Sequence, residues 1–153
     1  MNKIYCQNDV QAFGSTKSKR KLAEDVAYFC IEQMMPRMKM LDISIHLDKI
    51  SEADGYCLAV TNREFNLEIE KTLDEEDFIT AICHEMVHVK QFARGETQDI
   101  NIFTKKWKGT EYLSAYSTVD EYINLPWEKE AYKMQEELLQ KWKKMILKCL
   151  KKN

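Results

Sequence analysis

The chain has 153 residues, of which 44% are hydrophobic and 31% are charged, and its formal net charge is -2. That length is typical of one domain that buries its own core, so we predict a single domain over residues 1–153. The nearly balanced charge argues against a nucleic-acid-binding groove, which needs an excess of basic residues.

Nothing in the sequence indicates secretion or membrane insertion. The N-terminal stretch MNKIYCQNDVQAFG has no sustained apolar run, and no later segment has the length of a membrane span. The five cysteines are scattered without a C-x-x-C pair, which favours reduced, mostly buried thiols. We therefore expect a cytoplasmic protein that contacts neither membranes nor nucleic acid.

The first predicted elements are a helix and a strand. Apolar residues spaced by three and four predict an amphipathic helix over 20–35, which Pro36 ends. In LDISIHLDKI, residues 41–50, apolar and polar residues alternate, as in a half-buried strand. This alternation places His46 on the polar face.

Two further strands are predicted after the EADG turn at 52–55. YCLAVT (56–61) and FNLEIE (65–70) are separated by a short connection, which favours antiparallel pairing. The sequence thus predicts a small, mostly antiparallel sheet. Either of the two strands could form the sheet edge to which an extended peptide adds by strand pairing.

The next helix is predicted over residues 74–94. Thr72 and Glu75 have the spacing of a capping box, and Gly95 is typical of the position that ends a helix. Apolar residues lie on nearly all sides of this helix, so it should be central and buried. Polar residues in its middle therefore require an explanation.

Those polar residues form the motif HEMVH. His84 and His88 lie one helical turn apart, where two imidazoles can bind one zinc ion. Glu85 would act as general base, taking a proton from the attacking water and passing it to the leaving amine. The alternative is that the motif is accidental in an α+β structural protein.

The third ligand has to come from elsewhere in the chain. The only other histidine, His46, precedes the motif, and its polar strand face favours surface exposure. A downstream carboxylate is the better candidate. PWEKEAY supplies Glu128 and Glu130 in the first turns of a long helix predicted over 126–150. Periodicity alone does not decide between them.

The segment between the two helices, residues 95–125, shows no clear period, and a loop of that length is usually functional. Its Tyr112, Tyr116 and Tyr122 are candidate donors to the oxyanion that forms during hydrolysis, although packing is the simpler role for each. Gln91, one turn after His88, is expected either to line the cleft or to lie on the helix surface.

HEMVHVKQ followed by LPWEKEAY resembles the gluzincin superfamily of HExxH metallopeptidases, and especially small single-domain members from bacterial viruses and their hosts. The resemblance implies a zincin-like α+β fold and one zinc ion. In that family a glutamate followed by alanine completes the site, which implies His84, His88 and Glu130 as ligands and Glu85 as the base.

We therefore expect a zinc-dependent peptidase that acts on polypeptides. The alternative is a regulatory or binding module that keeps the fold but is catalytically silent or acts on one partner. Glu85 favours catalysis, because a structural zinc site does not require a base.

Overall fold

The computed structural model describes residues 7–152, so Cys6 lies outside the described residues. Strands and helices follow one another along the chain in this order: β1 (Asp9–Phe13), α1 (Lys17–Met34), β2 (Asp42–Asp48), β3 (Gly55–Ala59), β4 (Glu64–Glu70), α2 (Glu75–Ala93), β5 (Thr97–Asp99), β6 (Thr104–Trp107), β7 (Thr110–Leu113), α3 (Val119–Ile123) and α4 (Pro126–Lys151). The fold is α+β, as predicted.

The main sheet has the strand order β1-β2-β4-β3. β3 and β4 pair antiparallel, which confirms the predicted pairing, but β1 with β2 and β2 with β4 are parallel. The prediction of a mostly antiparallel sheet was therefore wrong. Alternation shows which side chains are buried, but it does not show strand direction. The short strand β1 was not predicted, and the passage from β1 through α1 to β2 makes that pair parallel.

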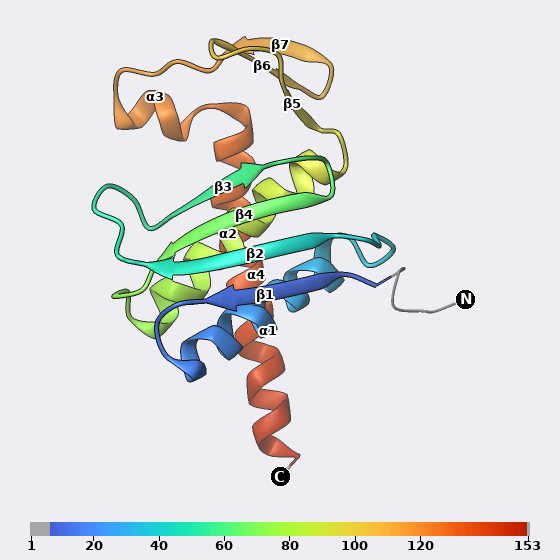
Figure 1. Cartoon of the computed structure of the whole chain (residues 1–153), viewed down its shortest axis with the longest axis vertical. Coiled ribbons are helices and arrows are strands. Elements are labelled where there is room, and N and C mark those ends of the chain that lie inside the picture. The colour runs from blue at the N-terminus through green and yellow to red at the C-terminus, as the bar shows by residue number, and fades with distance from the viewer. Residues whose placement is uncertain (1–6, 153) are drawn as a thin grey trace.

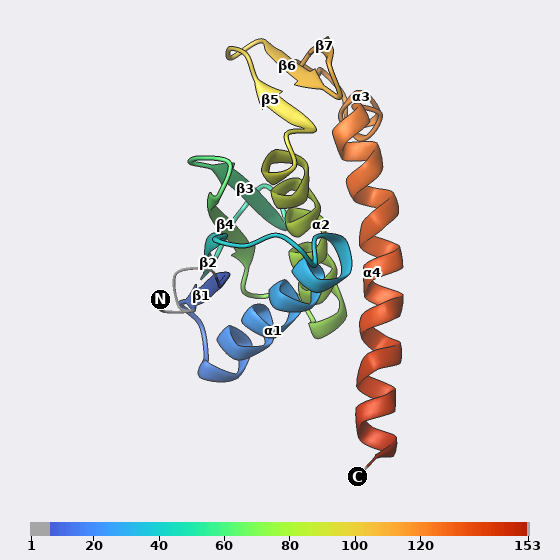
Figure 2. The same cartoon turned by 90° about the vertical axis from the view of Figure 1, so that its right-hand side faces the viewer.

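Three layers make up most of the molecule. In Figures 1 and 2, α1 and α2 cover one face of the main sheet, and α4 lies on the other side of α2. The covered face carries apolar side chains such as Ile45 and Leu67, which are fully buried and lie opposite each other in β2 and β4. Burying these side chains is the main force that holds the layers together.

α2 occupies the middle layer, between the sheet and α4 (Figure 2). Its buried residues lie on all sides of the helix, which confirms the prediction that it is central. Its N-terminus is capped by the Asp74 side chain, which accepts a hydrogen bond from the backbone N–H of Asp77 at 2.9 Å, and not by the predicted Thr72.

Residues 95–125 contain the second sheet, with the order β5-β6-β7, and α3. Figure 1 shows this segment beyond the β3 edge of the main sheet, near the start of α4. It carries exposed apolar side chains, including Ile102 and Leu113. None of the helices described for residues 7–152 is both long enough and apolar enough to cross a membrane.

Candidate metal centre

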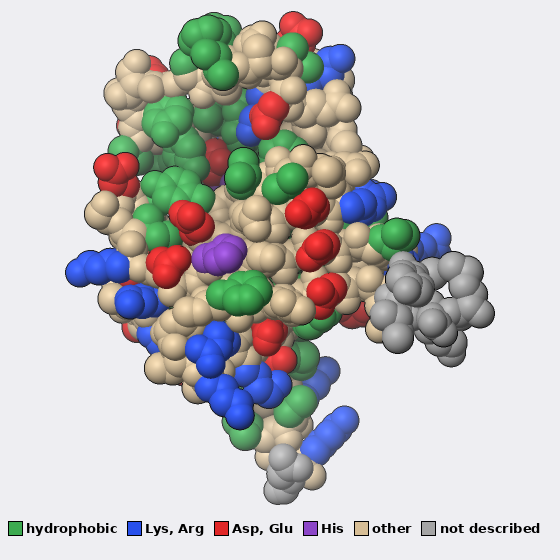
Figure 3. Space-filling model, viewed as in Figure 1, with side chains coloured by type: hydrophobic (Ala, Val, Ile, Leu, Met, Phe, Trp, Pro, Cys, Tyr) green, Lys and Arg blue, Asp and Glu red, His purple; other side chains and the backbone are tan. Residues whose placement is uncertain are grey.

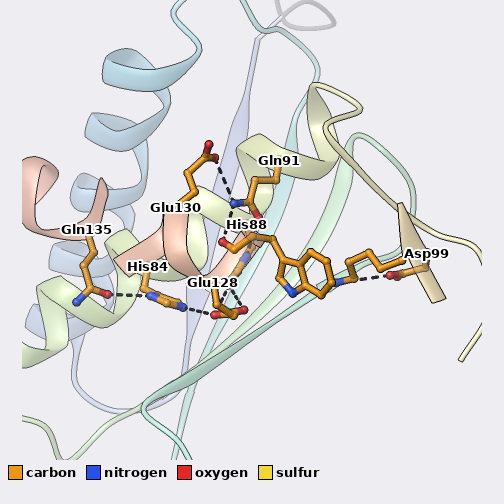
Figure 4. Close-up of polar contacts among 9 residues, drawn as sticks. His84, His88, Gln91, Asp99, Glu128, Glu130 and Gln135 are labelled. Atoms are coloured by element: carbon orange, nitrogen blue, oxygen red, sulfur yellow. Dashed lines mark hydrogen bonds and ion pairs between the residues drawn. The ribbon is translucent and has the colours of Figure 1, made fainter. Parts of the chain in front are cut away.

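The packing of α4 against α2 brings His84, His88 and Glu128 together (Figure 4). The carboxylate of Glu128 lies between the two imidazoles. Its Oε1 is 3.0 Å from Nε2 of His84, and its Oε2 is 3.1 Å from Nε2 of His88. The helical spacing of the two histidines sets one side of this group, and the first turn of α4 closes it.

All three residues are buried, and each offers one ligand atom within 4.8 Å of the other two. Glu128 is only 4% exposed and His84 8%. Isolated polar groups are costly to bury, so a cluster of this kind needs partners that satisfy every nitrogen and oxygen.

The outer ring nitrogens of both histidines have such partners. Nδ1 of His84 is 2.8 Å from Oε1 of Gln135, and Nδ1 of His88 is 2.9 Å from Oε1 of Gln91. The orientation of the Gln91 amide is fixed, because its Nε2 donates to the carbonyl of Trp127 at 2.9 Å and to Glu130 at 3.2 Å. Oε1 of Gln91 must therefore accept the Nδ1–H of His88.

This tautomer has a direct consequence for metal binding. A neutral His88 that donates through Nδ1 carries a lone pair on Nε2, and that lone pair points toward the carboxylate of Glu128, which is also an acceptor. Two facing acceptors require a cation between them, either a proton or a metal ion. Two imidazoles and one carboxylate form a donor set that zinc favours, so the residues present fit a single metal ion.

Glu128 and His88 shift each other's pKa. Burial by itself raises the pKa of Glu128, but the hydrogen bonds from His84 and His88 outweigh it and hold the pKa well below its usual range. Burial opposes protonation of His88, whereas the Glu128 carboxylate favours it, and the resulting pKa of His88 is raised. Glu128 is thus an anion that stabilises positive charge on His88.

Glu130, the residue favoured by the family resemblance, lies on another side of α4 and points away from the histidines (Figure 4). Its Oε1 is 2.8 Å from Nζ of Lys90, and its Oε2 is 3.5 Å from Nζ of Lys108. Although burial opposes it, the hydrogen bond from Lys90 lowers the pKa of Glu130. The structure thus brings Glu128, and not the expected Glu130, next to the two histidines.

Glu85 lies beside the group and lines a cavity of about 580 Å³ together with His84. It is 6% exposed, and burial raises the pKa of its carboxyl group. β3 comes very close here: a Cβ added to Gly55 would lie 3.1 Å from Cγ of Glu85. Glycine at position 55 therefore allows the edge strand to pass directly over the Glu85 side chain.

The three candidate tyrosines have different positions. Tyr116 and Tyr122 line the cavity, whereas Tyr112 packs against Trp127 with ring centroids 6.3 Å apart. Burial raises the pKa of Tyr122, and the nearby charge of Glu128 raises it further, so this phenol stays protonated. Tyr132, which the sequence did not single out, packs on the ring of His84 at 4.7 Å.

Two other expectations concern residues near the motif. Gln91 is completely buried, so it lies neither in the cleft nor on the helix surface. His46 is on the sheet face that the helices leave uncovered, stacked on Phe13 at 5.4 Å, as its polar strand position predicted. Gln135, the partner of His84, carries no signal in the sequence beyond its position two turns after Glu128 on α4.

Comparisons with protein-family models, with curated proteins and with solved structures find no match to this chain. The functional argument therefore depends on the buried His84, His88 and Glu128 group and its surroundings.

Proposed function

We propose that the protein is a zinc-dependent metallopeptidase in which His84, His88 and Glu128 hold the ion. The observation that carries this proposal is the buried carboxylate of Glu128 between two imidazoles whose outer nitrogens are already occupied by glutamines. When bound, zinc would lower the pKa of a water molecule and polarise the carbonyl of the substrate.

The residues around the ion would supply the rest of the chemistry. Glu85 would take the proton from the attacking water and give it to the leaving amine, and its raised pKa brings it closer to the range in which a group can do both. Tyr122 lines the same cavity and lies close enough to Glu128 and Glu85 for their charges to help raise its pKa, so it is the best placed of the three candidate tyrosines to donate to the developing oxyanion.

A polypeptide substrate is favoured by the position of β3. This strand is the edge of the main sheet nearest the cavity, and its Gly55 and Tyr56 line the cavity wall. An extended peptide that paired with β3 would place its backbone beside Glu85. β4 cannot take this role, because β2 and β3 occupy both of its sides.

The proposal is tested by comparing wild type with Glu85→Gln. Both proteins should bind one zinc ion per chain, and the variant should cleave a mixture of unstructured peptides at least about a hundredfold more slowly, the lower end of general acid–base contributions. Cleavage products are quantified by mass spectrometry. Equal cleavage by both proteins would contradict the role of Glu85, and zinc binding without cleavage by wild type would identify a binding module instead.

A further inference from the structure

The cavity beside the candidate centre has an acidic wall. Glu52 and Asp54, from the loop before β3, and Asp77, from the first turn of α2, line it, with Glu85 at the end next to His84. The described residues that line the cavity include no lysine or arginine. Figure 3 shows acidic and hydrophobic side chains gathered around the hollow on the face that carries β3.

Three of these acidic side chains have no cationic partner among residues 7–152. Among the residues described, no ion pair involves Glu52, Asp54 or Asp77. The pKa of Asp77 is raised, first by the charge of Asp74 and to a smaller extent by burial and by Asp54. Negative charge thus accumulates at this end of the cavity, where a positive charge would relieve it.

A second observation concerns Glu85, which lines the same cavity. The Glu85 carboxylate is nine-tenths buried, and it takes part in no hydrogen bond or ion pair within the part of the chain that the structure describes. Buried polar groups normally have partners. A carboxylate held this way at the end of a cavity is available to a molecule that enters from the acidic side.

The remaining wall of the cavity is aromatic. Tyr116 and Tyr122 pack together with ring centroids 4.8 Å apart, and Tyr132 comes from α4 beside His84. The aliphatic stem of a lysine or arginine packs well on such faces, while its charged end reaches toward carboxylates. An inorganic cation has no aliphatic stem to pack on the aromatic wall.

We propose that this cavity binds the side chain of a lysine or arginine in the polypeptide substrate, close to the bond that is cleaved, and that Asp54 and Asp77 determine this specificity. The inference rests on the proposed peptidase function and adds the class of side chain that the site selects. A peptide paired with β3 would pass Gly55 and Tyr56, so its side chains could enter the cavity directly.

The test measures binding separately from cleavage. Zinc-loaded Glu85→Gln protein, in which cleavage should be slow, is titrated with fluorescently labelled pentapeptides Ala-Ala-Xaa-Ala-Ala in which Xaa is lysine, arginine, norleucine or glutamate. Norleucine keeps the stem of lysine without the charge. We expect the lysine and arginine peptides to bind about tenfold tighter than the norleucine peptide, as for one close charge pair.

Substitutions identify the residues responsible. In the same background, Asp54→Asn combined with Asp77→Asn should reduce the preference for lysine over norleucine to about one. Glu75→Gln is the matched control, because it removes a charge from the same end of α2 at an exposed residue outside the cavity lining, and it should keep the preference. Circular dichroism shows whether each variant folds, and the single variants Asp54→Asn and Asp77→Asn replace the double variant if it does not.

Equal affinity for the lysine and norleucine peptides, or a preference that survives loss of both aspartates, would overturn the inference. So would Ca²⁺ binding that depends on the two aspartates while the peptides show no preference. A lysine preference in binding with no cleavage by wild type would contradict only the proposed catalysis. Cleavage without any preference would contradict only the inference.

Discussion

Glu128 and Glu130 are two residues apart on α4, but they belong to different parts of the molecule. About 200° of helix separates their side chains, so Glu128 faces the two histidines and Glu130 faces Lys90. Both carboxylates have a lowered pKa, Glu128 because of two imidazoles and Glu130 because of lysine and an amide. A lowered pKa therefore does not distinguish the two carboxylates, whereas the chemical nature of their partners does.

The partners of the two carboxylates differ in whether they can also bind a metal ion. A lysine ammonium neutralises Glu130 permanently, and a second acid, Glu96, also contacts Lys90 at 2.8 Å. An imidazole, unlike an ammonium group, can give up the proton that it shares with a carboxylate, and the ring nitrogen then offers a lone pair to a metal cation. The Glu130 side of α4 is therefore a structural ion-pair cluster, and the Glu128 side is chemically available. Gln91 is the connection between the two, since its amide contacts His88 on one side and Glu130 on the other.

Among the variants that test this difference, we expect the largest effect from Gln91→Leu, which should lower zinc affinity. Loss of the buried amide leaves the Nδ1–H of His88 without its acceptor, so zinc affinity should fall about 10- to 100-fold. Competition with a chromophoric chelator measures the affinity.

Gln135→Leu is the matched variant at His84. Gln135 is partly exposed, and among the described residues its amide contacts His84 and, at 3.4 Å, Glu136 alone. Its loss should therefore reduce zinc affinity less than Gln91→Leu does. Unchanged affinity in both variants would show that the amides do not orient the histidines.

A smaller effect, on stability, is expected from Lys90→Met. This change keeps the aliphatic stem but leaves Glu130 and Glu96 without their buried cation, so the free energy of unfolding should fall by about 2 kcal/mol. Denaturant unfolding of the metal-free protein measures it. Zinc should still bind at one ion per chain.

Lys108→Met is the control for Lys90→Met, and we expect it to have the smallest effect on stability. The Lys108 side chain is 54% exposed and its ammonium lies 3.5 Å from Glu130, so its loss should change stability by less than about 0.5 kcal/mol. If Lys90→Met abolished zinc binding while stability stayed constant, the two sides of α4 would not have the separate roles described above.

The sequence predicted the central helix and its HEMVH motif because apolar residues on every side of α2 are visible without any tertiary information. The choice between Glu128 and Glu130 was not predictable in that way, since both flank the apolar stripe of α4. The difference depends on Lys90 and Gln91 of α2. Their side chains donate hydrogen bonds to Glu130 only once α2 and α4 have packed together. For the same reason, strand direction and the pairing of Gln135 with His84 required the structure.

The most direct test of the metal centre is the zinc content of wild type, Glu128→Gln and Glu130→Gln after equilibration with zinc and removal of excess. Wild type and Glu130→Gln should each hold one zinc ion per chain, and Glu128→Gln should hold almost none while circular dichroism shows that it is folded. Zinc retained by Glu128→Gln and lost by Glu130→Gln would contradict the assignment, and a wild-type protein without zinc would contradict the metal centre itself.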